Sequence, residues 1–164
     1  MTGSPFVSMP PAADADPPEQ LPDAWIAGDG WWPDINLADL RDVATIDPTV
    51  TAPRLREAAV AAMLDVNRQL AAWRLPLELA GSVNLEAVPA AEADGQSVLV
   101  HHYARAVFST VAAGLAERLR NIAATTAGAE RAEEMLTIAD THRRDARWAV
   151  ADLQAKPRST VELI

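Results

Sequence analysis

Apolar residues recur at steps of three and four positions along three long segments of the chain, which is the spacing of amphipathic helices. The first segment follows Thr51 and Pro53, a preferred order of cap and early proline, and we expect Pro76 to end it. Its predicted inward positions are Leu55, Ala59, Ala62, Met63, Val66, Leu70 and Trp73. At 1.5 Å per residue, this segment predicts a helical rod of roughly 33 Å.

The second and third segments differ in how much of their surface is apolar. The second begins at Gln96 or Ser97 and is apolar on more than half of its circumference, which predicts a central helix contacted from several sides. Gly128 separates it from the third segment, which starts near Ala129 and carries a narrower apolar face. That face comprises Met135, Ile138 or Ala139, His142, Ala146, Ala149 or Val150, and Leu153.

Shorter elements precede and connect these segments. A short helix is predicted over 37–43, capped by Asp34 or Asn36. Its inward positions are Leu37, Leu40 and either Val43 or Ala44. Residues 75–95 are irregular and predict a connection, with a turn at the pair Asp94-Gly95.

The first 30 residues contain six of the chain's 12 prolines and few residues able to form a core. We expect this acidic arm to be extended or disordered on its own. Three of the five tryptophans, Trp25, Trp31 and Trp32, then fall within eight residues. These tryptophans either anchor the arm to the folded body or form an exposed contact surface, and burial is the commoner fate of tryptophan.

The last segment, residues 156–164, differs in character from the helix before it. Pro157 prevents that helix from continuing, and residues 159–164 have the alternating, β-branched pattern of an extended strand. A helical body offers such a strand no edge to pair with, so we expect a partner protein to receive it by strand addition. The predicted contacts are the apolar Val161, Leu163 and Ile164, with Arg158 and Glu162 setting the register.

These patterns predict an all-α fold, a bundle of three long helices plus a short N-terminal helix, with an extended N-terminal arm and an extended C-terminal tail. We assign residues 1–30 to the arm, residues 31–155 to the helical domain and residues 156–164 to the tail. A length of 164 residues suits one domain with a substantial core.

Composition and charge narrow the range of functions. The chain has no cysteine, which excludes disulfides and thiolate chemistry and fits a reducing cytoplasm. No apolar run approaches the roughly 20 residues that cross a bilayer, and the N-terminus lacks a signal-peptide pattern, so we expect a soluble protein without a membrane partner.

The net charge is −9, and residues 1–50 hold nine of the 23 acidic residues but one of the 14 basic ones. This balance disfavours sequence-independent binding of DNA.

The sequence offers little support for catalysis, a metal or a cofactor. His101 and His102 are neighbours on one helix and point about 100° apart, so they do not form a metal-binding pair, and a hydrogen-bonded role is favoured for His142. Acidic residues of the third helix lie in its first turns, where they favour the helix dipole. They are Glu130, Glu133, Glu134 and Asp140. We predict no enzyme activity and no cofactor; a small helical enzyme that depends on His142 is the third-ranked interpretation.

A basic cluster in the third segment is the strongest candidate for contact with nucleic acid. It runs from His142 to Arg147 and contains Arg143, Arg144 and Arg147. Ion pairing is the favoured interpretation, because Asp145 is interleaved with the arginines and Asp140 precedes Arg144 in the favourable i, i+4 order. Thirteen of the 14 basic residues are arginine, which suits fixed ion pairs within or between subunits. The candidates for a subunit interface or a channel lining are Arg143, Arg144, Arg147, Arg118 and Arg120.

Four stretches of the chain, in this order, resemble one known family: WWPDINLADLR, TIDPTVTAPRLREAAVAAMLDVNRQLAAWR, YARAVFSTVAAGLAERLR, and RRDARWAVADL with a terminal VELI. The family is that of the head completion protein, protein L, of contractile-tailed temperate phages. The likeness covers roughly residues 31–164. No single stretch is a chemical signature, so the specificity lies in their joint occurrence.

The resemblance implies a head-tail connector or adaptor, in which copies of this chain form a ring, a dodecamer, on the portal protein after DNA packaging. It implies a place at the head–tail junction of the virion, assembly in the host cytoplasm, passage of double-stranded DNA, and a tail-completion or neck protein below. The portal then receives the C-terminal tail. The alternative is a helical DNA-binding packaging accessory protein that uses Arg143, Arg144 and Arg147.

Overall fold

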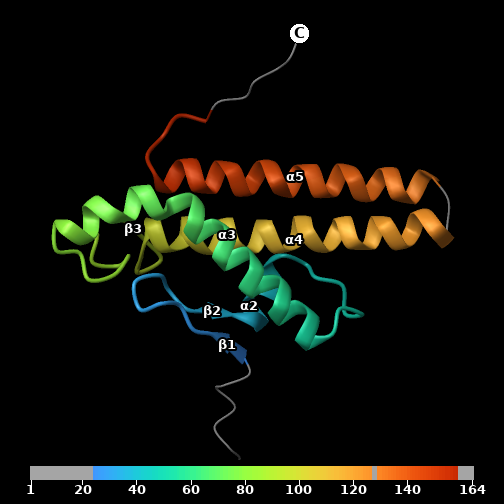
Figure 1. Ribbon diagram of the computed structural model, residues 1–164, viewed down its shortest axis with the longest axis horizontal. Coiled ribbons are helices and arrows are strands. Elements are labelled where there is room, and N and C mark those ends of the chain that lie inside the picture. The colour runs from blue at the N-terminus through green and yellow to red at the C-terminus, as the bar shows by residue number, and fades with distance from the viewer. Residues whose placement is uncertain (1–23, 127–128, 159–164) are drawn as a thin grey trace, which may run out of the picture.

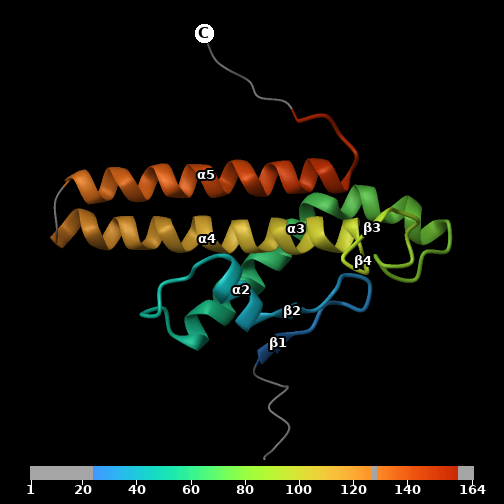
Figure 2. The same ribbon diagram turned by 180° about the vertical axis from the view of Figure 1, so that it is seen from behind.

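The computed structural model describes residues 24–126 and 129–158. Helices α4 (Val98–Thr126) and α5 (Ala129–Leu153) run side by side in opposite directions in both views of the molecule (Figure 1, Figure 2). Helix α3 (Ala52–Leu79) crosses α4 obliquely and also touches α5. Helix α4 therefore contacts both other long helices, as its broad apolar surface predicted. Within the described residues, no helix combines the length and the apolar character needed to span a membrane.

The N-terminal region packs on the side of α4 that faces away from α5 (Figure 1). Strand β1 (Trp25–Ile26) pairs antiparallel with β2 (Ile35–Asn36), and α2 (Leu37–Val43) follows directly. Residues 24–30, which the proline pattern assigned to the arm, thus include a paired strand, and Ile26 is buried. The predominantly helical fold is confirmed, whereas the short strands were not predicted.

Asn36, one of the two caps that the sequence offered, is the N-cap of helix α2. The Asn36 side chain accepts hydrogen bonds at 2.8 and 3.4 Å from two backbone N–H groups of the first turn. The sequence left Val43 and Ala44 open as the third inward position, and it is not Val43, because that side chain is 72% exposed. Ala44 packs against the core instead. With 3.6 residues per turn, Ala44 lies much closer than Val43 to the face formed by Leu37 and Leu40.

Helix α3 begins after Thr51 as predicted, but the prediction that it ends at Pro76 is wrong. The helix continues to Leu79. Because proline has no backbone N–H, the helix lacks one hydrogen bond at Pro76, close to its end. Packing of Leu77 against the core favours the continued helix. The N–H of Ala80 donates to the carbonyl of Pro76 at 3.0 Å, which closes the last turn.

A second small hairpin connects α3 to α4. Strand β3 (Glu92–Ala93) pairs antiparallel with β4 (Gln96–Ser97). Asp94 and Gly95 join them, with φ angles of 52° and 72°. Positive φ at both central positions is what a tight type I′ hairpin requires, and Asp-Gly is a favoured pair for it. The predicted turn is confirmed, and it leads the chain directly into α4.

The core joins the N-terminal region to the long helices. Tyr103 of α4 is fully buried; its ring stacks on Trp32 with 5.0 Å between centroids, and its hydroxyl donates to Asn67 Oδ1 of α3 at 2.8 Å. Burial raises the pKa of Tyr103, so the hydroxyl keeps its proton and its donor role. Other fully buried side chains are Leu40, Leu55, Leu70, Leu85, Leu153, Val66, Val107 and Val111.

Candidate functional site

The tryptophan-rich stretch forms a joint between the N-terminal region and α3. Trp31 and Trp32 are 4% and 3% exposed, and their rings meet edge to face at 4.5 Å. The indole Nε1 of Trp31 donates to the carbonyl of Ser82 at 3.2 Å. Trp25 is 38% exposed. Trp31 and Trp32 therefore lie inside the body, whereas Trp25 contributes to its surface.

Arg74 of α3 holds this joint from its outer side. The guanidinium lies 4.9 Å from the Trp31 ring and 5.8 Å from the Trp32 ring, and it pairs with Asp29 and, at 2.7 Å, with Glu78. Asp29 also accepts the backbone N–H groups of both tryptophans at 3.0 Å. Burial alone would raise the pKa of Asp29, but these hydrogen bonds outweigh it and hold the pKa below its ordinary value. We call Asp29, Trp31, Trp32 and Arg74 the tryptophan anchor.

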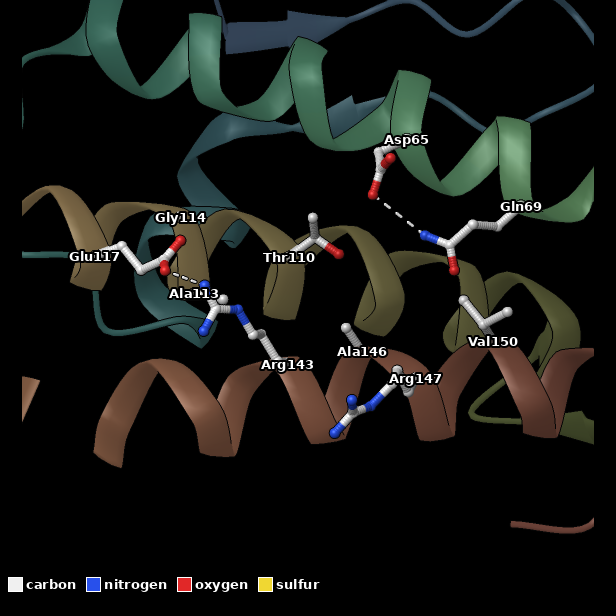
Figure 3. A pocket seen from close by; sticks show the side chains of 10 residues that line it. All are labelled: Asp65, Gln69, Thr110, Ala113, Gly114, Glu117, Arg143, Ala146, Arg147 and Val150. Atoms are coloured by element: carbon white, nitrogen blue, oxygen red, sulfur yellow. Dashed lines mark hydrogen bonds and ion pairs between the residues drawn. The ribbon is translucent and has the colours of Figure 1, made fainter. Parts of the chain in front are cut away.

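The basic cluster of α5 forms ion pairs within the chain. Arg143 reaches across to Glu117 of α4 (Figure 3) and pairs with Asp140 at 3.0 Å. The hydrogen bond to Glu117 is the main cause of the raised pKa of Arg143. The predicted Asp140–Arg144 pair is wrong, because Asp140 pairs with Arg143 and the Arg144 guanidinium lies over the Trp148 ring at 4.8 Å.

A groove of about 350 Å³ lies beside the Arg143–Glu117 pair, between α3, α4 and α5 (Figure 3). Small residues of α4 and α5 line it, among them Gly114 and Ala146. Charges of both signs face it, from Asp65 of α3 and from the pair itself. A narrow, mixed-charge groove of this kind suits contact with another protein surface better than contact with a phosphate backbone.

The remaining arginines of the predicted interface or channel set lie in different surroundings. Arg147 lines the groove and extends along α5 in Figure 3, without an ion-pair partner among the described residues. Arg118 is exposed and borders an adjoining hollow between α3 and α4. The side chain of Arg120 lies outside the described residues. The structure thus brings Arg143 and Arg147 to one groove and leaves Arg144 on Trp148.

The histidines and hydroxyls near these surfaces do not form a reaction centre in the described part of the chain. Nε2 of His101 lies 2.8 Å from the carbonyl of Ala93, and burial lowers the pKa of His102. The hydroxyl of Thr110, in the groove, donates to the carbonyl of Ala106 at 2.7 Å. Residues 24–126 and 129–158 contain no group of three or more histidine or acidic side chains that could hold a metal ion.

An exposed apolar row on α3 was missed by the sequence reasoning, which considered the opposite face of this helix. Val60, Leu64, Leu75 and Leu79 form the row, and Leu64 and Leu79 are 64% and 82% exposed. Their spacings of four, eleven and four residues return to one helix face, so the signal was present in the sequence. Aligned, exposed aliphatic side chains mark a contact surface. We call these four residues the α3 stripe.

The structure describes the chain up to Arg158, the first of the predicted tail contacts. Nε and Nη2 of Arg158 donate to the two carboxylate oxygens of Asp152 at 2.9 and 2.5 Å, and the guanidinium lies 5.2 Å from the Trp148 ring. Arg158 is therefore paired within the chain, whereas the sequence had assigned it to the register of a bound strand. The other predicted contacts, Val161, Glu162, Leu163 and Ile164, lie outside the described residues.

Paired charges, an exposed apolar stripe and a mixed-charge groove give the helical body surfaces that suit contact with other proteins. The family model described as phage head completion protein (GPL) matches residues 26–164. The chain therefore belongs to the phage head completion protein family, and the resemblance drawn from its sequence motifs is confirmed.

The match to a characterised relative agrees with this assignment. The chain is 38% identical over 134 residues to the head completion/stabilization protein of Escherichia phage P2, across 82% of this chain and 79% of that protein. No solved structure matches the chain. Because the family is one of structural head proteins and not of enzymes, the chain is a structural component of a phage virion that interacts with other head components.

Proposed function

We propose that this chain forms a ring of identical subunits, a dodecamer, that seats on the portal protein after DNA packaging. The ring continues the portal channel for double-stranded DNA and offers a platform to a tail-completion or neck protein at the head–tail junction. In this scheme residues 31–155 are the connector body, residues 156–164 are the portal-binding tail, and residues 1–30 are an arm whose last part, residues 24–30, already belongs to the body.

The observation that carries the portal-binding proposal is the way α5 ends. The helix stops at Leu153, and Arg158 is held on the outer surface of α5 instead of entering the core. Beyond it, Val161 and Leu163 stand at the alternate spacing that a sheet edge of another protein can accept, and Ile164 adds an apolar side chain on the opposite strand face. Glu162 falls between Val161 and Leu163 and supplies a polar contact in the same register.

Two surfaces of the body support the ring proposal. A closed ring of identical subunits needs two different faces on each copy, each fitted to the other on its neighbour. The α3 stripe exposes two pairs of aliphatic side chains, Val60 with Leu64 and Leu75 with Leu79, on one side of α3, and the exposed Arg68 lies between the pairs. The groove with Arg143 and Arg147, and Arg118 beside it, is a concave face of mixed charge. We assign the stripe to contact with a neighbouring copy.

Charge distribution supports passage of DNA through the ring without tight binding. Arg143 and Arg158 are paired with carboxylates, and the net charge of the chain is −9. A channel along which DNA moves benefits from weak phosphate contacts. Arg147, which has no ion-pair partner among the described residues, is the residue that favours the DNA-binding alternative. Micromolar, steeply salt-dependent binding of duplex DNA in a filter assay at two salt concentrations would support that alternative.

Deletion of residues 159–164 tests the portal-binding proposal. The shortened protein is expected to keep the helical circular dichroism spectrum of the intact chain and to lose the capture of purified portal in a pull-down. Val161→Asp with Leu163→Asp in the full-length chain should give the same loss, because a charge cannot enter an apolar contact. Val83→Asp, the same change at a position of the body that is 77% exposed, is the control and should retain binding. A shortened protein that captures portal as well as the intact one would show that the tail is not the binding segment.

A further inference from the structure

We infer that Trp148, Asp152 and Arg158 form a clamp that fixes where the C-terminal segment leaves the helical body, and so presents that segment to the portal in one orientation. We call these three residues the exit clamp. The inference rests on the proposed portal binding of residues 159–164. It adds side chains of the body itself to the residues that determine how tightly the portal is bound.

The backbone at the end of α5 forms a tight turn without glycine. The N–H of Lys156 donates to the carbonyl of Ala151 at 2.8 Å, and the N–H of Ala155 donates to that of Asp152 at 3.0 Å, the two bonds of a Schellman motif. Ala155 has a φ of 52°, a left-handed conformation that usually requires glycine. Pro157, two residues later, restricts the chain further because its ring fixes φ. An alanine in this conformation indicates that contacts outside the turn help to hold it.

Arg158 provides such a contact. Its guanidinium binds both carboxylate oxygens of Asp152, a bidentate arrangement that sets the direction of the arginine as well as its position. The Trp148 ring, one turn earlier on α5, lies 5.2 Å from this guanidinium and 4.8 Å from that of Arg144. Arg105 of α4 approaches Asp152 at 3.9 Å. The last described residue is therefore held by side chains of α5, and α4 supports the same carboxylate.

Asp152 is the centre of the exit clamp. Its side chain is 18% exposed, and the hydrogen bond from Arg158 is the main reason that its pKa lies below the ordinary value. The carboxylate therefore stays charged at neutral pH, and the pair persists. A segment that starts from a fixed point and direction loses less conformational freedom on binding, so the clamp strengthens binding without touching the portal.

Two substitutions in the full-length chain test the exit clamp. Asp152→Asn and Arg158→Gln each break the bidentate pair. Glu86→Gln is the control, because it removes a charge from an exposed position outside residues 156–164 and leaves the pair intact. The first measurement is ¹⁵N relaxation of the backbone amides of residues 159–164, which needs no portal. The second is the affinity for purified portal. Each clamp variant is expected to raise the mobility of these amides and to weaken portal binding about tenfold, while the control changes neither.

The double variant, Asp152→Asn with Arg158→Gln, is expected to bind no more weakly than either single variant, because both changes remove the same pair. Unchanged amide mobility in both single variants would overturn the clamp. Tighter portal binding by Asp152→Asn would also overturn it, since Arg158 would then be held back from the portal. A different result would show that the proposed function is wrong, namely portal binding that survives deletion of residues 159–164. In that case the relaxation data still decide whether the clamp exists.

Discussion

Two joints, one near each end of the described chain, use the same side-chain chemistry at different depths. In the tryptophan anchor, Arg74 lies over two indole rings and pairs with Asp29; in the exit clamp, Arg158 lies over one indole ring and pairs with Asp152. The Arg74 side chain is 21% exposed and its tryptophans are buried, whereas the Arg158 side chain is 47% exposed and Trp148 is half-buried. The carboxylates show the reverse order, with Asp29 49% and Asp152 18% exposed, so the difference in depth lies in the arginines and the indoles. Burial, and not the residue types, decides how much such a joint stabilises the fold.

The difference matches two requirements of a head completion protein. Its body must stay folded, and the tryptophan anchor ties the first described strand to α3 and to the buried Tyr103. Its contact with another head component must form during assembly, and the exit clamp lies at the surface where it can act on such a contact. Loss of the anchor should therefore change stability, and loss of the clamp should change binding.

Trp32→Ala should give the largest effect on stability. Removal of a buried indole that stacks on Tyr103 is expected to cost about 3–5 kcal/mol, because the core cannot refill the cavity. Urea unfolding followed by circular dichroism measures this change. Trp25→Ala, at an exposed position of the same stretch, is the control and should cost less than about 1 kcal/mol. Equal costs for the two variants would show that Trp32 is not part of a rigid core.

Arg74→Met compares the two joints directly. The variant keeps a long apolar stem over the indole rings but loses the pairs with Asp29 and Glu78, at an expected cost of about 1–2 kcal/mol. Arg158→Met is the matched change in the exit clamp and should lower the urea midpoint less than Arg74→Met does. If Arg158→Met were as destabilising as Arg74→Met, the distinction between a buried joint and a surface joint would be wrong.

The smallest effect is expected in the pH dependence of stability. The pKa of Asp29 is lowered in the folded chain, so its contribution is fully present above the ordinary carboxyl pKa and is lost as the pH falls through the lowered value. Thermal unfolding of the wild type and of Asp29→Asn should therefore differ most at neutral pH and begin to converge below about pH 4, as the pH falls towards the lowered pKa. A difference that stays constant from neutral to acid pH would mean that the Asp29 charge plays no part in the anchor.

Local signals in the sequence predicted much of the helical framework. Asn36 caps α2 through its side chain, Thr51 occupies the position before α3 without a side-chain hydrogen bond, and Asp94-Gly95 forms the predicted turn. Each of these features depends on a few neighbouring residues. Pro76 was misjudged for the opposite reason. Packing of Leu77 against the core, which no local pattern reveals, keeps the helix going past the proline.

The surface arginines were harder to predict, because several side chains compete to contact each guanidinium. Arg144 has an acidic residue at the favourable spacing, yet the Trp148 ring attracts its guanidinium and Asp140 pairs with Arg143. Arg158 had the pattern of a tail contact, but it folds back onto Asp152 six residues earlier. Such choices depend on which side chains the fold places within reach, and a sequence pattern does not contain that information.

Particle reconstruction of the head–tail junction tests the central claim most directly, namely that copies of this chain bind the portal through segments that leave from the exit clamp. The account predicts one ring of subunits on the portal, with density running from each Arg158 into the portal and with the Arg158–Asp152 pair intact. C-terminal segments that run instead to a tail-side protein, or copies that do not form a ring against the portal, would contradict it.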